Sequence, residues 1–140
     1  MQLEINGSKW QLSWGMGALE DLCDELGLSL QDIELELMTN ETRTINKLTY
    51  CALKNGADLN DTSLDFSYKF FLNWLDNAPQ STGKEIMDEY MKSKLLGQTM
   101  QDRFNEIIER LNANEPESAE PLKKKNTRSV KSSATPTNGG

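Results

Sequence analysis

The dipeptide Asn6-Gly7 constrains the fold of this chain more than any other feature of the sequence. It is the pair that best tolerates positive φ angles at both central positions of a two-residue turn. Apolar residues alternate with polar ones on both sides of it, at Leu3, Ile5, Trp10, Leu12 and Trp14. The pattern therefore predicts a β-hairpin over residues 1–14. Because two strands alone are only marginally stable, the apolar face of this hairpin needs a cover.

Short amphipathic helices are expected to supply that cover. Apolar residues recur three and four positions apart in six segments, which is the spacing of one helix face. A polar loop is expected between the third and fourth segments, over residues 57–63. The expected helices span residues 18–26, 30–38, 43–55 and 66–76, one that begins near residue 82, and one from about 100 to 112.

Glycine and serine residues mark the ends of the first three helices. We expect Gly27 to end the first helix in a left-handed cap, and Ser29 to cap the start of the second. Gly56 is expected to end the third. The second segment also alternates like a strand, but Glu34 and Glu36 are poor strand formers, so we favour a helix.

The sequence leaves two interpretations open around Gly97. Thr82 and Glu85 have the spacing of a capping box, which predicts the start of a helix. This helix is expected to carry Leu95 on its apolar stripe. It either ends near Gly97, before a last helix that Thr99 caps, or continues through the glycine.

The helical pattern stops after residue 112. We therefore expect one domain over residues 1–112, with the hairpin at 1–14 and helices within 16–112, and a disordered tail over residues 113–140. The predicted fold is α+β and mainly α-helical, with the N-terminal β-hairpin packed on a small helical bundle. Residues 1–114 contain 19 acidic and 10 basic residues, whereas residues 115–140 contain 3 and 5, so the predicted domain is strongly acidic.

Composition argues against several classes of function. The chain contains no histidine, which excludes Ser-His-Asp catalysis and imidazole ligands for a metal. Its formal charge of −7 argues against binding to nucleic acid. No apolar run reaches the roughly 18 to 20 residues that span a bilayer. We therefore expect no enzyme activity, no cofactor, no metal, no nucleic acid and no membrane partner.

The remaining chemical groups are interpreted as structural. Cys23 and Cys51 fall on apolar helix stripes and are expected to be reduced and buried. Paired carboxylates are interpreted as the solvated faces of helices rather than as acid–base pairs. These pairs are Glu20-Asp21, Asp24-Glu25 and Asp88-Glu89.

Methionine and aromatic side chains are the candidate partner contacts. Met-rich surfaces adapt to partner helices, although methionines also fill gaps in small cores. We expect contacts from exposed apolar positions at Met87, Tyr90, Met91 and Met100. A structural role is expected for the hairpin aromatics and for the aromatic helix, at Trp10, Trp14, Phe70, Phe71 and Trp74.

The N-terminal segment resembles the opening of phage tail assembly chaperones. Residues 3–19, LEINGSKWQLSWGMGAL, match the hairpin "I-N-G-K-x-Y-x-L" of that family and the aromatic-Gly-x-Gly step after it. Residues 50–54 (YCALK) and 71–76 (FLNWLD) are similar to two later helical segments of the family. Trp10 stands where the family more often has Tyr or Phe. The resemblance covers about residues 1–112.

The resemblance implies a role in building the long tails of siphovirus-type phages or prophages. Such proteins bind the tape measure protein, keep it soluble and help to recruit tail tube subunits. They act in the cytoplasm of the infected host and are absent from the mature virion. In many phages a programmed frameshift near the end of the gene makes a longer form that recruits the tube protein. Lys123, Lys124 and Lys125 lie where such a slip would fall.

Two other functions remain open from the sequence. One is a small tail-completion or connector protein that stays in the virion. The other is an enzyme that uses one of the carboxylate pairs. Self-association is also compatible with the chaperone interpretation.

Overall fold

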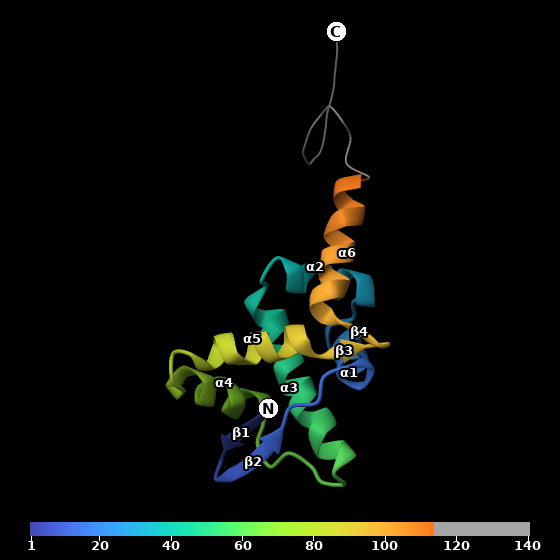
Figure 1. Cartoon of the computed structure of the whole chain (residues 1–140). Helices are drawn as coiled ribbons and strands as arrows, with labels where there is room; N and C mark the ends of the chain where they lie inside the picture. Colours follow the sequence, from blue (N-terminus) through green and yellow to red (C-terminus); the bar gives the residue numbers. More distant parts are fainter. Residues whose placement is uncertain (114–140) are drawn as a thin grey trace, which may run out of the picture. The chain divides into compact units, whose positions relative to one another are not determined.

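The computed structural model describes residues 1–113 (Figure 1). Residues Met1–Asn105 form one compact unit, and the residues from Glu106 onward belong to a second. The elements, in chain order, are β1 (Gln2–Ile5), β2 (Ser8–Gln11), α1 (Met16–Leu26), α2 (Leu30–Met38), α3 (Thr42–Leu59), α4 (Tyr68–Asn77), α5 (Thr82–Lys92), β3 (Lys94–Leu95), β4 (Gln98–Thr99) and α6 (Met100–Ala113). The predicted mainly helical α+β class is therefore confirmed. The predicted tail lies outside the described residues, apart from Ala113.

The N-terminal hairpin has the predicted turn and register. Asn6 and Gly7 occupy the turn with φ angles of 56° and 81°, and Ile5 pairs with Ser8 across it. The pleat turns Leu3, Ile5 and Trp10 to the buried face. The indole Nε1 of Trp10 donates to the carbonyl of Ile5 at 3.2 Å, so its polar atom is satisfied inside the core.

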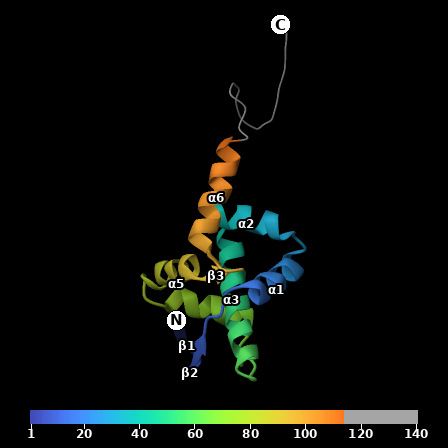
Figure 2. The same ribbon diagram turned by 45° about the vertical axis from the view of Figure 1, so that its right-hand side comes forward.

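Helix α3 is the element around which the first unit is assembled. It contacts β2, α1, α2 and α4. In both views it lies between α1 on one side and α4 and α5 on the other (Figures 1 and 2). Its buried positions form the centre of the core, at Thr44, Leu48, Thr49, Cys51, Ala52, Leu53, Gly56 and Ala57. The aromatic side chains of α4 extend this core, with Phe71 fully buried and stacked 6.0 Å from Trp74.

The prediction that Gly56 ends α3 is wrong, because the helix continues to Leu59. The glycine serves close packing instead. A β-carbon at this position would lie 2.1 Å from the carbonyl oxygen of Gln11, so only glycine lets the strand approach the helix. Two hydrogen bonds hold the same contact, from Ser13 N–H to the Ala52 carbonyl at 3.0 Å and from Asn55 Nδ2 to the Ser13 carbonyl at 3.0 Å.

The first two predicted helix caps are confirmed. Gly27 ends α1 in the left-handed conformation, with φ 67°, and its N–H donates to the Cys23 carbonyl at 2.8 Å. The side chain of Ser29 accepts from Asp32 N–H at 3.2 Å and begins α2. The helical interpretation of residues 30–38 is therefore correct.

The predicted capping box at Thr82 is wrong. Helix α5 already includes Thr82, which is buried, and the preceding Ser81 makes no side-chain cap. Thr82 therefore packs into the interior instead of facing the first turn of the helix.

Neither interpretation of the segment around Gly97 is fully correct. Helix α5 ends at Lys92, and a short hairpin formed by β3 and β4 separates it from α6. Leu95 is buried, but it belongs to a strand and not to a helix stripe. The predicted cap of the last helix is confirmed, since Thr99 Oγ1 accepts from Asp102 N–H at 3.1 Å.

The packing at Gly56 leads to a stability prediction. We expect Gly56→Ala to lower the free energy of unfolding by about 2 kcal/mol or more, because the new methyl group meets backbone that cannot move independently. Urea denaturation followed by circular dichroism measures this change.

Gly83→Ala in α5 is the matched control. A β-carbon at Gly83 meets nothing within 4 Å, so alanine there should leave stability unchanged or raise it by up to about 1 kcal/mol. Equal effects of the two substitutions would contradict the close approach at Gly56.

Candidate functional site

The four predicted contact residues separate into two pairs. Tyr90 and Met100 are only 1% exposed, so the expectation that they lie on the surface is wrong. Met87 and Met91 are half-buried and lie one turn apart on α5. The helical spacing of the sequence identified the apolar stripe, but it did not show which part of the stripe other elements cover.

Tyr90 lies in a crowded aromatic environment. Its ring centroid is 5.1 Å from that of Trp14 and 6.2 Å from that of Phe104, so α6 and the segment after β2 both cover it. Its hydroxyl and the indole N–H of Trp14 are buried without hydrogen-bond partners among the described residues. Burial raises the pKa of Tyr90, and the negative charge of Glu34 raises it further.

A buried ion pair lies in the same region. The carboxylate of Glu34 on α2 is buried and accepts hydrogen bonds from Nε and Nη2 of Arg103 on α6, the second at 3.3 Å. The pair thus ties the start of α6 to α2. Sequence reasoning missed this pair because the two residues are 69 positions apart and each also fits the polar face of its own helix.

Apolar side chains remain exposed on several elements. The exposed set within the described residues is Met16, Leu35, Leu59, Phe70, Leu96, Ile108 and Leu111. Phe70 was expected to be structural, but its side chain is exposed, whereas Trp10 is buried and Trp14 and Trp74 are half-buried.

Helix α6 carries two of the exposed residues. Ile108 is 45% exposed and Leu111 is 53% exposed, and Ile107 beside them is half-buried. These positions continue the three- and four-residue spacing that begins at Met100 and Phe104, both of which are buried. The apolar stripe of α6 therefore extends beyond the residues that are covered.

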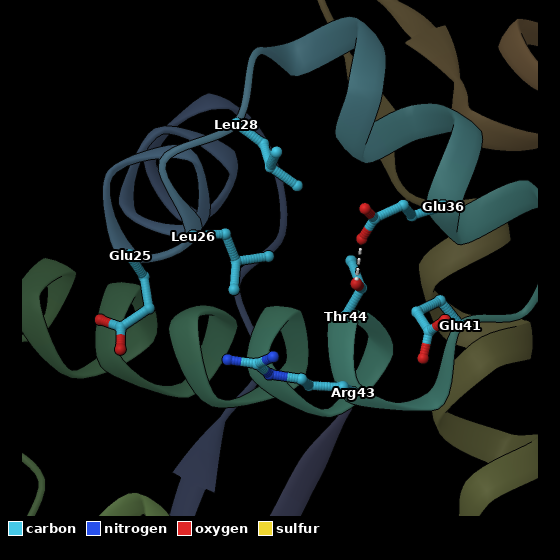
Figure 3. A pocket seen from close by; sticks show the side chains of 7 residues that line it. All are labelled: Glu25, Leu26, Leu28, Glu36, Glu41, Arg43 and Thr44. Carbon is cyan, nitrogen blue, oxygen red and sulfur yellow. Dashed lines mark hydrogen bonds between the residues drawn. The ribbon is translucent and has the colours of Figure 1, made fainter.

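A pocket of about 390 Å³ lies where the segment between α1 and α2 faces the first turns of α3 (Figure 3). Leu26 and Leu28 form its apolar side, and the guanidinium of Arg43 is its only cation. Three carboxylates also line it, from Glu25, Glu36 and Glu41. The lining is net negative and therefore disfavours phosphate and other anions.

Two of those carboxylates already have structural partners. Glu36 Oε1 accepts from the buried Thr44 hydroxyl at 2.5 Å, and Glu25 pairs with Lys47 at 3.2 Å. These two contacts therefore connect α2 and α1, respectively, to α3.

Cys23 and Cys51 are not joined to each other in a disulfide. Cys51 is buried in α3, and burial raises the pKa of its thiol to about 11, so little of the nucleophilic thiolate forms at neutral pH. Cys23 is half-buried rather than buried, and burial followed by the charges of Asp24 and Glu20 raises the pKa of its thiol. Neither thiol is therefore activated.

The described residues contain neither a metal-binding cluster nor a membrane-spanning helix. Within residues 1–113, no group of three or more Cys, Asp or Glu side chains is arranged to hold a metal ion. In the same part of the chain, no helix has both the length and the apolar character needed to cross a bilayer. The lysine run from Lys123 to Lys125 lies outside the described residues.

Comparisons of the chain with protein-family models, with curated proteins and with solved structures found no match in any of the three. The resemblance to tail assembly chaperones therefore rests on the sequence motifs alone.

The unpartnered hydroxyl of Tyr90 predicts the effect of removing it. We expect Tyr90→Phe to leave the free energy of unfolding at pH 7 within about 0.5 kcal/mol of the wild type, because no hydrogen bond is lost. Tyr50→Phe is the control. Its hydroxyl donates to the Phe66 carbonyl at 2.9 Å, and losing this bond should cost about 1 kcal/mol.

The wild type and Tyr90→Phe should also differ in stability at alkaline pH. The folded-state pKa of Tyr90 is raised, so its stabilising contribution is complete below pH 10 and is lost as pH rises further. Tyr90→Phe should remove this part of the alkaline loss and leave the part due to Cys51. Thermal unfolding between pH 7 and 11 measures the difference. An equal alkaline loss in both proteins would contradict the burial of Tyr90.

The ion pair predicts strong coupling between its two residues. We expect Arg103→Met to lower the free energy of unfolding by about 2–4 kcal/mol, since it leaves the buried Glu34 carboxylate without the guanidinium that neutralises it. Glu34→Leu should also lower it, because the hydrogen bonds to Arg103 are lost. The double variant should regain most of that loss.

Lys84→Gln is the surface control for this cycle. It breaks the exposed pair between Lys84 and Asp88, at 2.8 Å, and should hardly change stability. Chemical denaturation of all five proteins tests the cycle. Strictly additive effects at Glu34 and Arg103 would contradict the pairing.

Proposed function

We propose that this chain is a non-enzymatic tail assembly chaperone of a long-tailed phage or prophage. It binds the tape measure protein, keeps it soluble and helps to recruit tail tube subunits. The proposal places it in the cytoplasm of the infected bacterium and outside the mature virion. Its identity as a chaperone comes from the resemblance of residues 3–19, 50–54 and 71–76.

The observation that carries the proposal is the exposed end of the apolar stripe on α6. Ile108 and Leu111 present an amphipathic helix face to solvent, which is a surface that another amphipathic helix can cover. A tape measure protein is long and mostly helical, and its apolar stripes are exposed before assembly. Met87 and Met91 offer a second adaptable surface on α5.

The charge of the chain suits this role. Residues 1–114 are strongly acidic, so chaperone copies bound along one partner repel each other and the complex stays soluble. Recruitment of the tube protein belongs to a longer, frameshifted form in this proposal. Lys123 to Lys125 mark where that form would diverge.

The alternative from another class is a tail-completion or connector protein that stays in the virion. Exposed apolar residues also suit the subunit contacts of such a protein. Mass spectrometry of purified virions separates the two functions, because abundant copies of this chain in the particle would favour the connector.

Co-expression with the tape measure protein, the long helical protein that this proposal expects to be encoded beside the chain, tests the chaperone function. We expect the wild type to keep most of that protein in the soluble fraction and to co-purify with it. Ile108→Ser/Leu111→Ser should lower the soluble amount several-fold, because it removes the apolar contact area. Quantitative gel densitometry of soluble and pelleted fractions measures the change.

Asn112→Ser is the control on the same helix, since it replaces one exposed polar residue with another. It should behave like the wild type. Failure of the wild type to co-purify with the long protein, or to solubilise it, would contradict the proposed function.

A further inference from the structure

Leu96 has both an unusual backbone conformation and an unusual exposure. It lies in the two-residue turn between β3 and β4, with a φ angle of 54°. A side chain with a β-carbon clashes with its own backbone in this left-handed region, so leucine is a poor choice there. Its side chain is 82% exposed, the most among the large apolar residues described. Neither the local backbone conformation nor burial explains why this position is a leucine.

The N-terminal hairpin shows what the same turn ordinarily contains. Asn6-Gly7 and Leu96-Gly97 both have two positive φ angles. In each hairpin, the residues on either side of the turn are paired across the two strands. The other non-glycine residues with positive φ in residues 1–113 are Asn40 and Asp61, which favour this region. Leu96 is thus the exception among the described non-glycine residues with positive φ, since the others are all asparagine or aspartate.

The turn is held rigidly at its base. Leu95 is buried beside it, and Met100 N–H donates to the Ser93 carbonyl at 2.9 Å, which continues the ladder of the hairpin. Figure 1 shows this hairpin between α5 and α6. The backbone that carries Leu96 is therefore ordered before binding, so mainly the leucine side chain loses freedom when a partner covers it.

Positive charge flanks this leucine in an otherwise acidic chain. Lys92 and Lys94 are both exposed, and neither forms an ion pair within the described residues. A partner that fits this tip has an apolar groove to receive a leucine and carboxylates beside the groove. The exposed seam of an acidic amphipathic helix has this chemistry.

We propose that the β3–β4 turn is a docking anchor, in which Leu96 enters the apolar seam of a partner helix and Lys94 faces a carboxylate beside that seam. This inference rests on the proposed function, because the tape measure protein supplies the helix. Binding then gives a reason for leucine at position 96 in spite of its local backbone strain. A lipid surface is the less favoured partner, because one exposed leucine beside two lysines buries too little apolar area to hold a chain on a bilayer.

Leu96→Asn tests the anchor because it separates folding from binding. We expect its melting temperature to rise by several degrees, since asparagine suits the turn conformation. In co-expression with the long helical protein, it should lower the soluble amount of that protein at least fivefold. Leu59→Asn is the matched control, because Leu59 is also highly exposed, at 71%, but lies in a helix with ordinary φ. It should leave the soluble amount unchanged.

Lys94→Gln tests the charge beside the leucine. It should lower the soluble amount of the long protein about twofold or more, and the effect should shrink at high salt. Lys69→Gln, an exposed lysine on α4, is its control and should have no effect.

The outcomes distinguish the anchor from the function on which it rests. If Leu96→Asn solubilises the long protein as well as the wild type does, the anchor is wrong and the proposed function stands. If the wild type itself fails, both are wrong. A lower melting temperature for Leu96→Asn would give Leu96 a folding role and overturn the anchor. So would Leu96-dependent binding to phosphatidylglycerol vesicles, or a Leu96-dependent dimer in size-exclusion chromatography.

Discussion

The close approach of the N-terminal hairpin to α3 is the contact on which the rest of the first unit depends. Without a side chain at Gly56, the carbonyl of Gln11 can lie directly against the helix. The next residues then bond to α3 through Ser13 and Asn55. The apolar face of a marginal two-stranded ribbon is covered in this way, and α3 becomes the shared support for α1, α2 and α4.

Buried polar groups define a second level of organisation. The Glu34–Arg103 pair joins α2 to the start of α6, although a buried ion pair adds less stability than its geometry suggests because both charges leave water. The pair instead fixes which faces of α2 and α6 meet. Tyr90 lies nearby without a hydrogen-bond partner for its hydroxyl among the described residues. The region thus combines a satisfied charge pair with an unsatisfied hydroxyl, so its polar groups contribute unequally to stability.

The exposed apolar residues are what a partner-binding function would use. Ile108 and Leu111 are exposed on a helix face, and Leu96 is exposed on a strained turn. These are different physical situations, since an exposed helix face is common, whereas a leucine in a left-handed turn opposes its own local preference. The proposed chaperone has both kinds of exposed residue, and the strained one carries more information about binding.

The sequence by itself determined the local structure where one residue type decides the backbone. Asn6-Gly7 predicted the hairpin, and Gly27, Ser29 and Thr99 predicted three helix ends, because turns and caps depend on φ preferences and on nearby hydrogen bonds. The helical periodicity likewise located the six described helices, although it assigned Leu95 to the apolar stripe of α5, whereas the structure places it in β3.

Only the tertiary structure decided which parts of those stripes are covered and which residues act across the fold. It buried Tyr90 and Met100 but left Met87 and Met91 partly exposed, although all four were expected on the surface. It also turned Gly56 from an expected helix end into a packing site. Periodicity reports that a side is apolar, whereas coverage depends on residues distant in the sequence, so no local pattern contains it.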